Sequence, residues 1–312
     1  MEHLTKYYGQ LAAIKDVHFR VEKGEIMGFL GPNAAGKTTT MRILTCFMPA
    51  TSGDARVAGC DVFSEPVEAR RHIGYLPENV PLYTDMTVRS YLKFMASLKG
   101  VSIRKRQNRV NATMEACGLT ERRDDIIGHL SKGFRQRVGI AQALVHDPEV
   151  LILDEPTVGL DPKQINEIRQ LIRGLGGERT IILSTHILPE VAMTCNKVVI
   201  IDEGQVVAVD TLENLTSQLM QSNRVRVVVG GPLVEVEACL RRIPGVLSVR
   251  SMNRVAEDQC AFDMEADLDT DIRPKTASHI VGKGWDLLEM RSLGMSLEDI
   301  FLKLTTKEAK AE

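Results

Sequence analysis

Over about the first two-thirds of the chain, short apolar runs alternate with longer amphipathic stretches. The clearest runs are residues 26–30, 150–155 and 180–184, and each has the length and aliphatic content of a buried parallel strand. Between them, helices are expected at residues 38–47, after the first run, and at residues 131–145, where one side of the helix is largely apolar. Strands that alternate with helices predict an α/β domain built on a parallel sheet.

Two regions depart from this alternation. Residues 87–146 are largely helical by their spacing and predict a helical subdomain. In the last part of the chain the predicted order is strand, helix, two strands, helix and strand, which is typical of a small α+β ferredoxin-like fold. We therefore expect two domains, residues 1–220 and residues 223–312, and a final amphipathic helix at residues 297–304. Alternating apolar and polar side chains at residues 17–21 predict one more, half-exposed strand.

Composition narrows the functional classes. The 312 residues are 44% apolar and 26% charged, as in ordinary globular proteins, and the net charge of −2 gives no electrostatic case for nucleic-acid binding. Six scattered cysteines form no C-x-x-C pair, and the seven histidines show no H-x-x-x-H spacing, so we expect neither a disulfide frame nor a zinc site. Because no run approaches the length of a membrane span and no signal peptide is present, we expect a chain without a direct membrane span.

Residues 31–39 read Gly-Pro-Asn-Ala-Ala-Gly-Lys-Thr-Thr and have the form G-x-x-x-x-G-K-[ST] of a phosphate-binding loop. Gly31 and Gly36 allow the tight bend that points backbone N–H groups at a polyphosphate. Lys37 supplies a positive charge to the β- and γ-phosphates, and Thr38 offers a hydroxyl to Mg²⁺. The predicted ATP-binding residues of this loop are Gly31, Pro32, Asn33, Ala34, Ala35, Gly36, Lys37, Thr38 and Thr39.

Two acidic residues end the predicted strand at residues 150–155. The carboxyl ends of parallel strands border the crevice in which open α/β sheets bind ligands. Asp154 is therefore suited to hold Mg²⁺, and Glu155 to polarise an attacking water. His186 follows the next strand; it is either a structural histidine or a side chain that reaches a γ-phosphate.

Other candidate residues are ambiguous on their own. Ser131 can cap a helix, and with Gly133 it forms either a second anion site or simply a well-capped helix start. Glu78 follows a predicted strand and is either a solvated loop charge or a functional carboxylate. Tyr7 and Tyr8 precede a glycine near the phosphate loop and are either core residues or rings that stack on adenine.

The order and spacing of these motifs resemble the ATP-binding subunit of ABC transporters over residues 1–220. Residues 31–39 match Walker A, and residues 150–155 match Walker B with its catalytic glutamate. Residues 130–134 stand at the signature motif and residues 159–161 at the D-loop, with Asp161. The resemblance assigns His186 as the switch histidine and Tyr8 as the adenine-stacking aromatic, and it implies a P-loop ABC ATPase fold with a RecA-like core.

The chain departs from the family pattern at a few positions. Ala34 replaces a frequent glycine of Walker A. Lys132 and Phe134 replace Gly and Gln of the signature, whereas Ser131 and Gly133 are retained. Glu78 stands where the family usually has its Q-loop glutamine. The signature segment and the ending Ser-Leu-Glu-Asp-Ile-Phe are most similar to the ABC-2 type export branch, whose members carry a small C-terminal domain.

The resemblance also implies partners and an arrangement. Two subunits, here expected to be identical, would pack head to tail around two ATP molecules, with a transmembrane permease as a further partner and no nucleic acid. The signature residues Ser131, Lys132 and Gly133 would then act on the ATP of the other chain, while Thr38, Glu78 and Asp154 hold Mg²⁺. The permease would bind a groove at residues 78–95, with Tyr83 and Met86 as contacts, so that the protein lies in the cytoplasm at the inner face of the membrane.

Two other functions fit some of the same residues. A soluble ABC ATPase of DNA repair or translation would share the ATPase motifs, but such proteins carry coiled-coil or zinc-binding inserts or a second ATPase unit, which this sequence lacks. A binding module that ATP only gates would not need the acidic pair and the histidine. The ATP-hydrolysing subunit of an exporter is therefore the function that we expect.

Overall fold

The computed structural model describes residues 1–219, 223–256, 259–267, 270–293 and 301. These residues fall into two compact units, one formed by Met1–Leu212 and the other within Glu213–Lys303. Each unit has a hydrophobic core of its own.

A six-stranded sheet forms the centre of the first unit, in the order β11-β10-β3-β9-β8-β7. Strands β3, β7, β8, β9 and β10 run parallel, and β11 pairs with β10 in an antiparallel hairpin. Their bounds are β3 Ile26–Leu30, β7 Ile73–Leu76, β8 Val150–Asp154, β9 Thr180–Thr185, β10 Lys197–Asp202 and β11 Gln205–Asp210. The apolar runs at residues 26–30, 150–155 and 180–184 thus form parallel strands, as predicted, and the structure makes them neighbours in the order β3-β9-β8.

Both faces of this sheet are covered at its centre, which explains why β3 and β8 are buried along their whole length. Along β8, Leu151 and Leu153 pack into one core, whereas Val150 and Ile152 pack into the other. Helices α1, α2, α6 and α7 belong to this unit, with bounds Lys37–Leu44, Pro66–His72, Pro162–Leu175 and Leu188–Thr194. Helix α8, Leu212–Leu219, follows β11.

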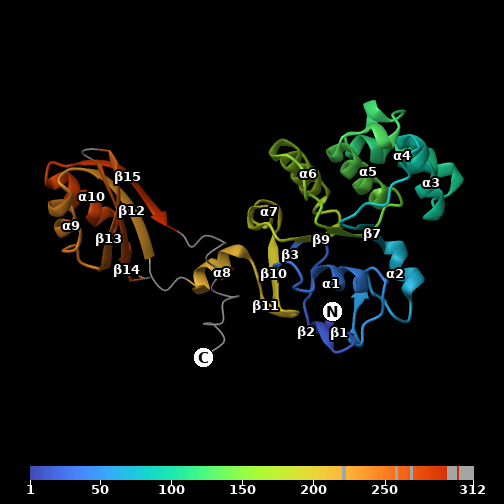
Figure 1. Cartoon of the computed structure of the whole chain (residues 1–312), viewed down its shortest axis with the longest axis horizontal. Helices are drawn as coiled ribbons and strands as arrows, with labels where there is room; N and C mark the ends of the chain where they lie inside the picture. Colours follow the sequence, from blue (N-terminus) through green and yellow to red (C-terminus); the bar gives the residue numbers. More distant parts are fainter. Residues whose placement is uncertain (220–222, 257–258, 268–269, 294–300, 302–312) are drawn as a thin grey trace. The chain divides into compact units, whose positions relative to one another are not determined.

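The expected helical subdomain consists of α3 Val88–Leu98, α4 Ile103–Ala116, two short 3₁₀ turns and α5 Lys132–Leu144. These helices lie together beside β7 in Figure 1. Tyr91, Leu92 and Ile140, all buried, belong to their shared core. The apolar stripes read from the sequence are therefore packing surfaces.

Residues 18–21 do not form the strand predicted for residues 17–21, because β2 is Leu11–Val17. Strand β2 joins β1 Glu2–Tyr8 and β4 Ser52–Asp54 in a small antiparallel sheet, and β5 Arg56–Val57 pairs with β6 Cys60–Asp61. The alternation beyond Val17 comes from packing instead: Phe19 is buried, and its ring lies 5.3 Å from that of Phe29.

The second unit has the elements β12 Asn223–Gly230, α9 Leu233–Leu240, β13 Val246–Ala256, β14 Gln259–Ala266, α10 Arg273–Gly282 and β15 Asp286–Leu293. Its four strands pair in the order β13-β14-β12-β15, all antiparallel. This is the β-α-β-β-α-β order predicted from the sequence. The helix expected at residues 297–304 lies outside the described residues except for residue 301.

Within the described part of the chain, no helix has the length and apolar character needed to cross a bilayer.

Candidate active site

The phosphate loop connects β3 to α1, and two of its glycines are required by close packing. A Cβ atom on Gly31 would lie 2.3 Å from the carbonyl oxygen of Ile201. Gly36 has a φ of +102°, and a Cβ atom there would lie 2.6 Å from Ile14 Cγ2. Only glycine fits these two positions, so the loop has the tight curvature that the motif predicts.

Lys37 lies at the centre of the site, with only 6% of its surface exposed. Its Nζ donates hydrogen bonds to the carbonyl oxygens of Gly31 at 2.8 Å and Pro32 at 3.0 Å, and lies 3.7 Å from Glu155 Oε1. Burial lowers the pKa of Lys37, and the negative charges of Glu155 and Asp154 oppose that shift. The site therefore concentrates a cation and two acidic side chains, all three buried, in a small space.

Glu155 and His186 meet across the ends of β8 and β9. His186 Nδ1 lies 2.9 Å from Glu155 Oε1 and 3.0 Å from Oε2. The backbone N–H of Glu155 donates to the carbonyl oxygen of Ser184 at 2.9 Å, which joins the two strand ends. Glu155 has a φ of 50°, an uncommon conformation for a residue with a side chain.

Asp154 is fully buried, and neither of its carboxylate oxygens accepts a hydrogen bond of normal geometry from a described residue. Burial raises the pKa of Asp154, while the nearby hydroxyls of Ser184 and Thr38 and the charge of Lys37 act in the opposite direction. Buried carboxylate oxygens without donors, next to a hydroxyl, are suitable ligands for a hard cation. The residues present therefore fit the expected Mg²⁺.

A cavity of about 460 Å³ lies over the phosphate loop. It brings together nine of the eighteen site residues predicted from the sequence, although they come from distant parts of the chain. The residues around it are Ala13, Asn33, Ala34, Gly36, Lys37, Thr38, Thr39, Glu78, Glu155, Val158 and His186. Ala13 and Val158 were not foreseen, since neither carries a chemically distinctive side chain.

The other predicted residues lie outside this cavity. Tyr8 is 45% exposed, and its hydroxyl donates to Met48 Sδ at 3.1 Å. Ser131 caps α5 by accepting from the N–H of Phe134 and borders a separate hollow of about 330 Å³. Asp161 caps α6 by accepting from the N–H of Gln164 at 2.9 Å.

The remaining signature residues contact the start of α6 and the D-loop of the same chain. A Cβ atom on Gly133 would lie 2.7 Å from Gln164 Cδ, and one on Gly159 would lie 2.0 Å from Lys132 Nζ. The signature and the D-loop are thus packed against each other, and Val158, directly before the D-loop, borders the phosphate cavity.

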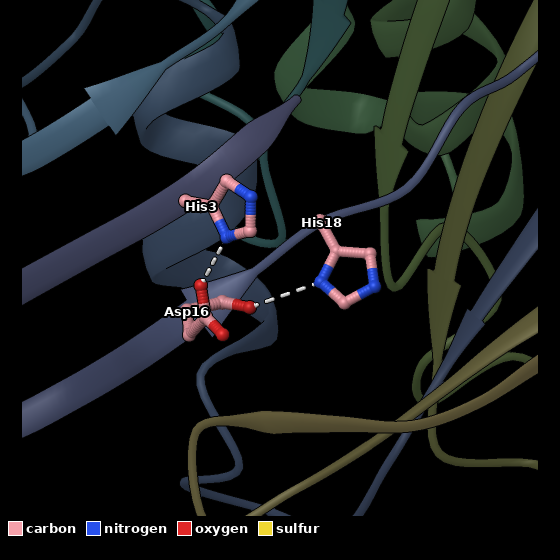
Figure 2. Close-up of side chains that lie close together, drawn as sticks. All are labelled: His3, Asp16 and His18. Carbon is pink, nitrogen blue, oxygen red and sulfur yellow. Dashed lines mark hydrogen bonds and ion pairs between the residues drawn. The ribbon is translucent and has the colours of Figure 1, made fainter.

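A second polar cluster, formed by His3, Asp16 and His18, was missed because its members are separated in the sequence (Figure 2). Asp16 Oδ1 lies 2.6 Å from His3 Nδ1, and the backbone oxygen of Asp16 lies 3.3 Å from His18 Nδ1. All three residues are exposed. Because Asp16 already bonds to both histidines beside the irregular β1–β2 pairing, we assign the cluster a structural role.

Comparison with known proteins identifies the family. The family described as ABC transporter matches residues 14–158. The linearmycin resistance ATP-binding protein of Bacillus subtilis (strain 168) is 33% identical over 306 residues, which is 97% of this chain and 97% of that protein. The chain belongs to the ABC transporter ATP-binding proteins.

Two further similarities agree with membership of this ABC family. The bacitracin transport ATP-binding protein of Bacillus licheniformis is 42% identical over 204 residues, covering 65% of this chain and 66% of that protein. A solved ATP-binding cassette, a dimer in a post-hydrolysis state bound to ADP and Pi, is 25% identical, with a TM-score of 0.61 over 68% of this chain and 97% of its own. The resemblance, the fold class and the ABC-type ATPase activity expected from the sequence are confirmed.

Proposed function

We propose that this ABC ATPase powers an ABC-2 type exporter, and that two identical chains hydrolyse ATP at sites that they share. The observation that carries the proposal is the separation of Ser131 from the cavity around Lys37. A serine hydroxyl and free N–H groups at a helix start suit a phosphate. On one chain they lie apart from the phosphate loop, so a second chain gives them a nucleotide to contact.

The chemistry follows from the cavity. Glu155 accepts a proton from the attacking water, and His186 orients the Glu155 carboxylate. Lys37 and the loop N–H groups stabilise charge on the phosphates. Thr38, Asp154 and Glu78 would hold Mg²⁺, which when bound neutralises phosphate charge. The exposed ring of Tyr8 is available to stack on adenine.

A groove of about 630 Å³ is the proposed permease site. It is lined by Glu78 and Thr38, which also border the phosphate cavity, and by the exposed aromatic rings of Tyr83 and Phe94, which meet edge to face at 5.6 Å. A groove that shares residues with the nucleotide site can transmit its changes to a partner. Met86, the other contact expected here, packs against the core instead.

The names of two relatives, concerning linearmycin resistance and bacitracin transport, support export as the direction and an antibiotic as the type of cargo. The permease would then hold the protein at the cytoplasmic face of the membrane. The full-length similarity to the resistance protein favours this function over DNA repair or translation.

The test of the shared site is Ser131→Arg. We expect steady-state ATP hydrolysis to fall at least about 100-fold while monomeric protein still binds ATP, because the new side chain blocks only the second surface. Ser251→Arg, an exposed position in the second unit, is the matched control and should behave as wild type. Intact hydrolysis in Ser131→Arg would contradict the proposal of a shared site. Stimulation of hydrolysis by nucleic acid would contradict the proposed function in export.

A further inference from the structure

We infer that Glu190, on α7, is a positioning residue that fixes Glu155 and His186 relative to each other. The inference rests on the proposed function, since it concerns the same site. Glu190 is 1% exposed and does not border the cavity. It acts through its neighbours.

Both carboxylate oxygens of Glu190 accept a hydrogen bond from a threonine hydroxyl. Thr157 donates to Oε1, and Thr185 donates to Oε2 at 2.9 Å. Thr185 Oγ1 in turn accepts from the N–H of Ile187 at 3.1 Å. One side chain thus holds the backbone on both sides of His186.

The two threonines flank the proposed catalytic pair. Thr157 lies just beyond Glu155, in the turn closed by a hydrogen bond from the Val158 N–H to the Glu155 carbonyl oxygen at 3.3 Å. Thr185 directly precedes His186. Glu190 therefore connects the segment that follows β8 to the end of β9. The 2.9 Å contact between His186 and Glu155 joins the same two strand ends.

The energetics favour a positioning role over simple packing. A buried carboxylate is costly unless its oxygens are satisfied, and an apolar residue would fill the same space without that cost. Among the described residues, the Glu190 carboxylate accepts its side-chain hydrogen bonds from the two threonine hydroxyls and forms no ion pair with Lys or Arg. What the Glu190 carboxylate contributes is a fixed geometry. Glu155 has a positive φ, and such a backbone conformation persists only where the surrounding residues hold it in place.

The experiment measures ATP hydrolysis and ATP binding of full-length variants. Glu190→Leu removes both hydrogen bonds, and we expect kcat to fall about 10- to 100-fold with the ATP dissociation constant changed less than about 3-fold. Thr185→Val removes one bond and should show a smaller loss of kcat. Thr194→Val is the matched control, because Thr194 is buried on the same helix with no hydrogen-bond partner for its hydroxyl among the described residues; it should leave kcat unchanged.

Two further measurements separate positioning from a general structural effect. In Glu190→Gln the threonine hydroxyls can rotate so that one donates to the amide oxygen and the other accepts from the amide nitrogen, and we expect kcat within about 3-fold of wild type. The second measurement combines Glu190→Leu with His186→Ala. If Glu190 acts through the catalytic pair, the kcat of this double variant should be less than about 3-fold below that of the slower single variant.

The outcomes are distinct. Wild-type kcat in both Glu190→Leu and Thr185→Val, or losses that multiply fully with His186→Ala, would overturn the inference. If those variants are normal while Glu155→Gln is slow, only the role of Glu190 fails. If Glu155→Gln and His186→Ala themselves turn over normally, the proposed site fails, and the inference fails with it.

Discussion

His186 Nδ1 lies 2.9 Å and 3.0 Å from the two carboxylate oxygens of Glu155, although the two residues belong to different strand ends. A carboxylate can only accept, so the imidazole carries a proton on Nδ1 and holds the carboxylate in one orientation. Lys37 Nζ, 3.7 Å from Glu155 Oε1, approaches the same oxygen. The carboxylate is therefore placed between a histidine and the phosphate-loop lysine.

The proposed general base can be tested by Glu155→Gln. We expect hydrolysis to fall about 10²–10⁴-fold, because an amide cannot accept the proton of water, while the phosphate loop still binds ATP. Phosphate release and nucleotide titration measure the two effects. Glu149→Gln is the control, since Glu149 precedes the other end of β8 and accepts from His72 at 2.8 Å. Near-normal turnover in Glu155→Gln would rule out the assignment.

Two glycine substitutions separate backbone strain from steric blocking. Gly36→Ala places a Cβ 2.6 Å from Ile14 Cγ2, whereas Gly59→Ala, at a φ of +85°, meets no described atom within 4 Å. We expect Gly59→Ala to cost about 1–2 kcal/mol of stability and Gly36→Ala to cost more and also abolish ATP binding. Thermal unfolding and nucleotide titration report these effects. Equal stability losses in the two variants would show that the contact with Ile14 adds no cost beyond the backbone strain of Gly36→Ala.

Ala34 occupies the left-handed region with a φ of +66°, at the position where the family often has glycine. Ala34→Gly relieves strain of about 1–2 kcal/mol but adds freedom to the unfolded chain, so we expect stability unchanged or raised by up to about 1 kcal/mol. Ala35→Gly, at a buried neighbour without positive φ, should lower stability by about 0.5–1 kcal/mol or more. Chemical denaturation distinguishes them, and a larger loss in Ala34→Gly would contradict the strain argument.

His146 makes stability depend on pH. Burial, with repulsion from Lys99, lowers the pKa of His146 from 6.5 to about 4, and Nε2 lies 3.0 Å from the carbonyl oxygen of Ile73. Between these two values the unfolded chain binds a proton that the folded chain does not, so stability falls as pH falls from 6.5 towards 4. The contribution is at most about 1.4 kcal/mol per pH unit.

Urea unfolding of His146→Gln measures this contribution. The variant should lose less stability than wild type between pH 7 and pH 5, because glutamine does not titrate. An unchanged pH slope would mean that His146 contributes nothing to it.

The sequence was informative wherever local chemistry dictates the backbone. The Gly31–Gly36 loop, the apolar run before it and the Ser131 cap were predictable, because glycine, burial and capping act over a few residues. It was misleading at residues 17–21, where the packing of Phe19 against Phe29 imitates a strand pattern. Met86 is similar: its place in the groove segment did not reveal that it packs inward.

The sequence alone determined the ATPase motifs and the α/β fold, because each motif is a short run whose residue types must occur in a fixed order. Only the tertiary structure decided that Glu155 contacts His186, that Asp154 lacks hydrogen-bond donors among the described residues, and that Glu190 joins two strand ends. These relationships depend on which strands become neighbours in the sheet, and neighbouring strands are set by packing over long sequence distances.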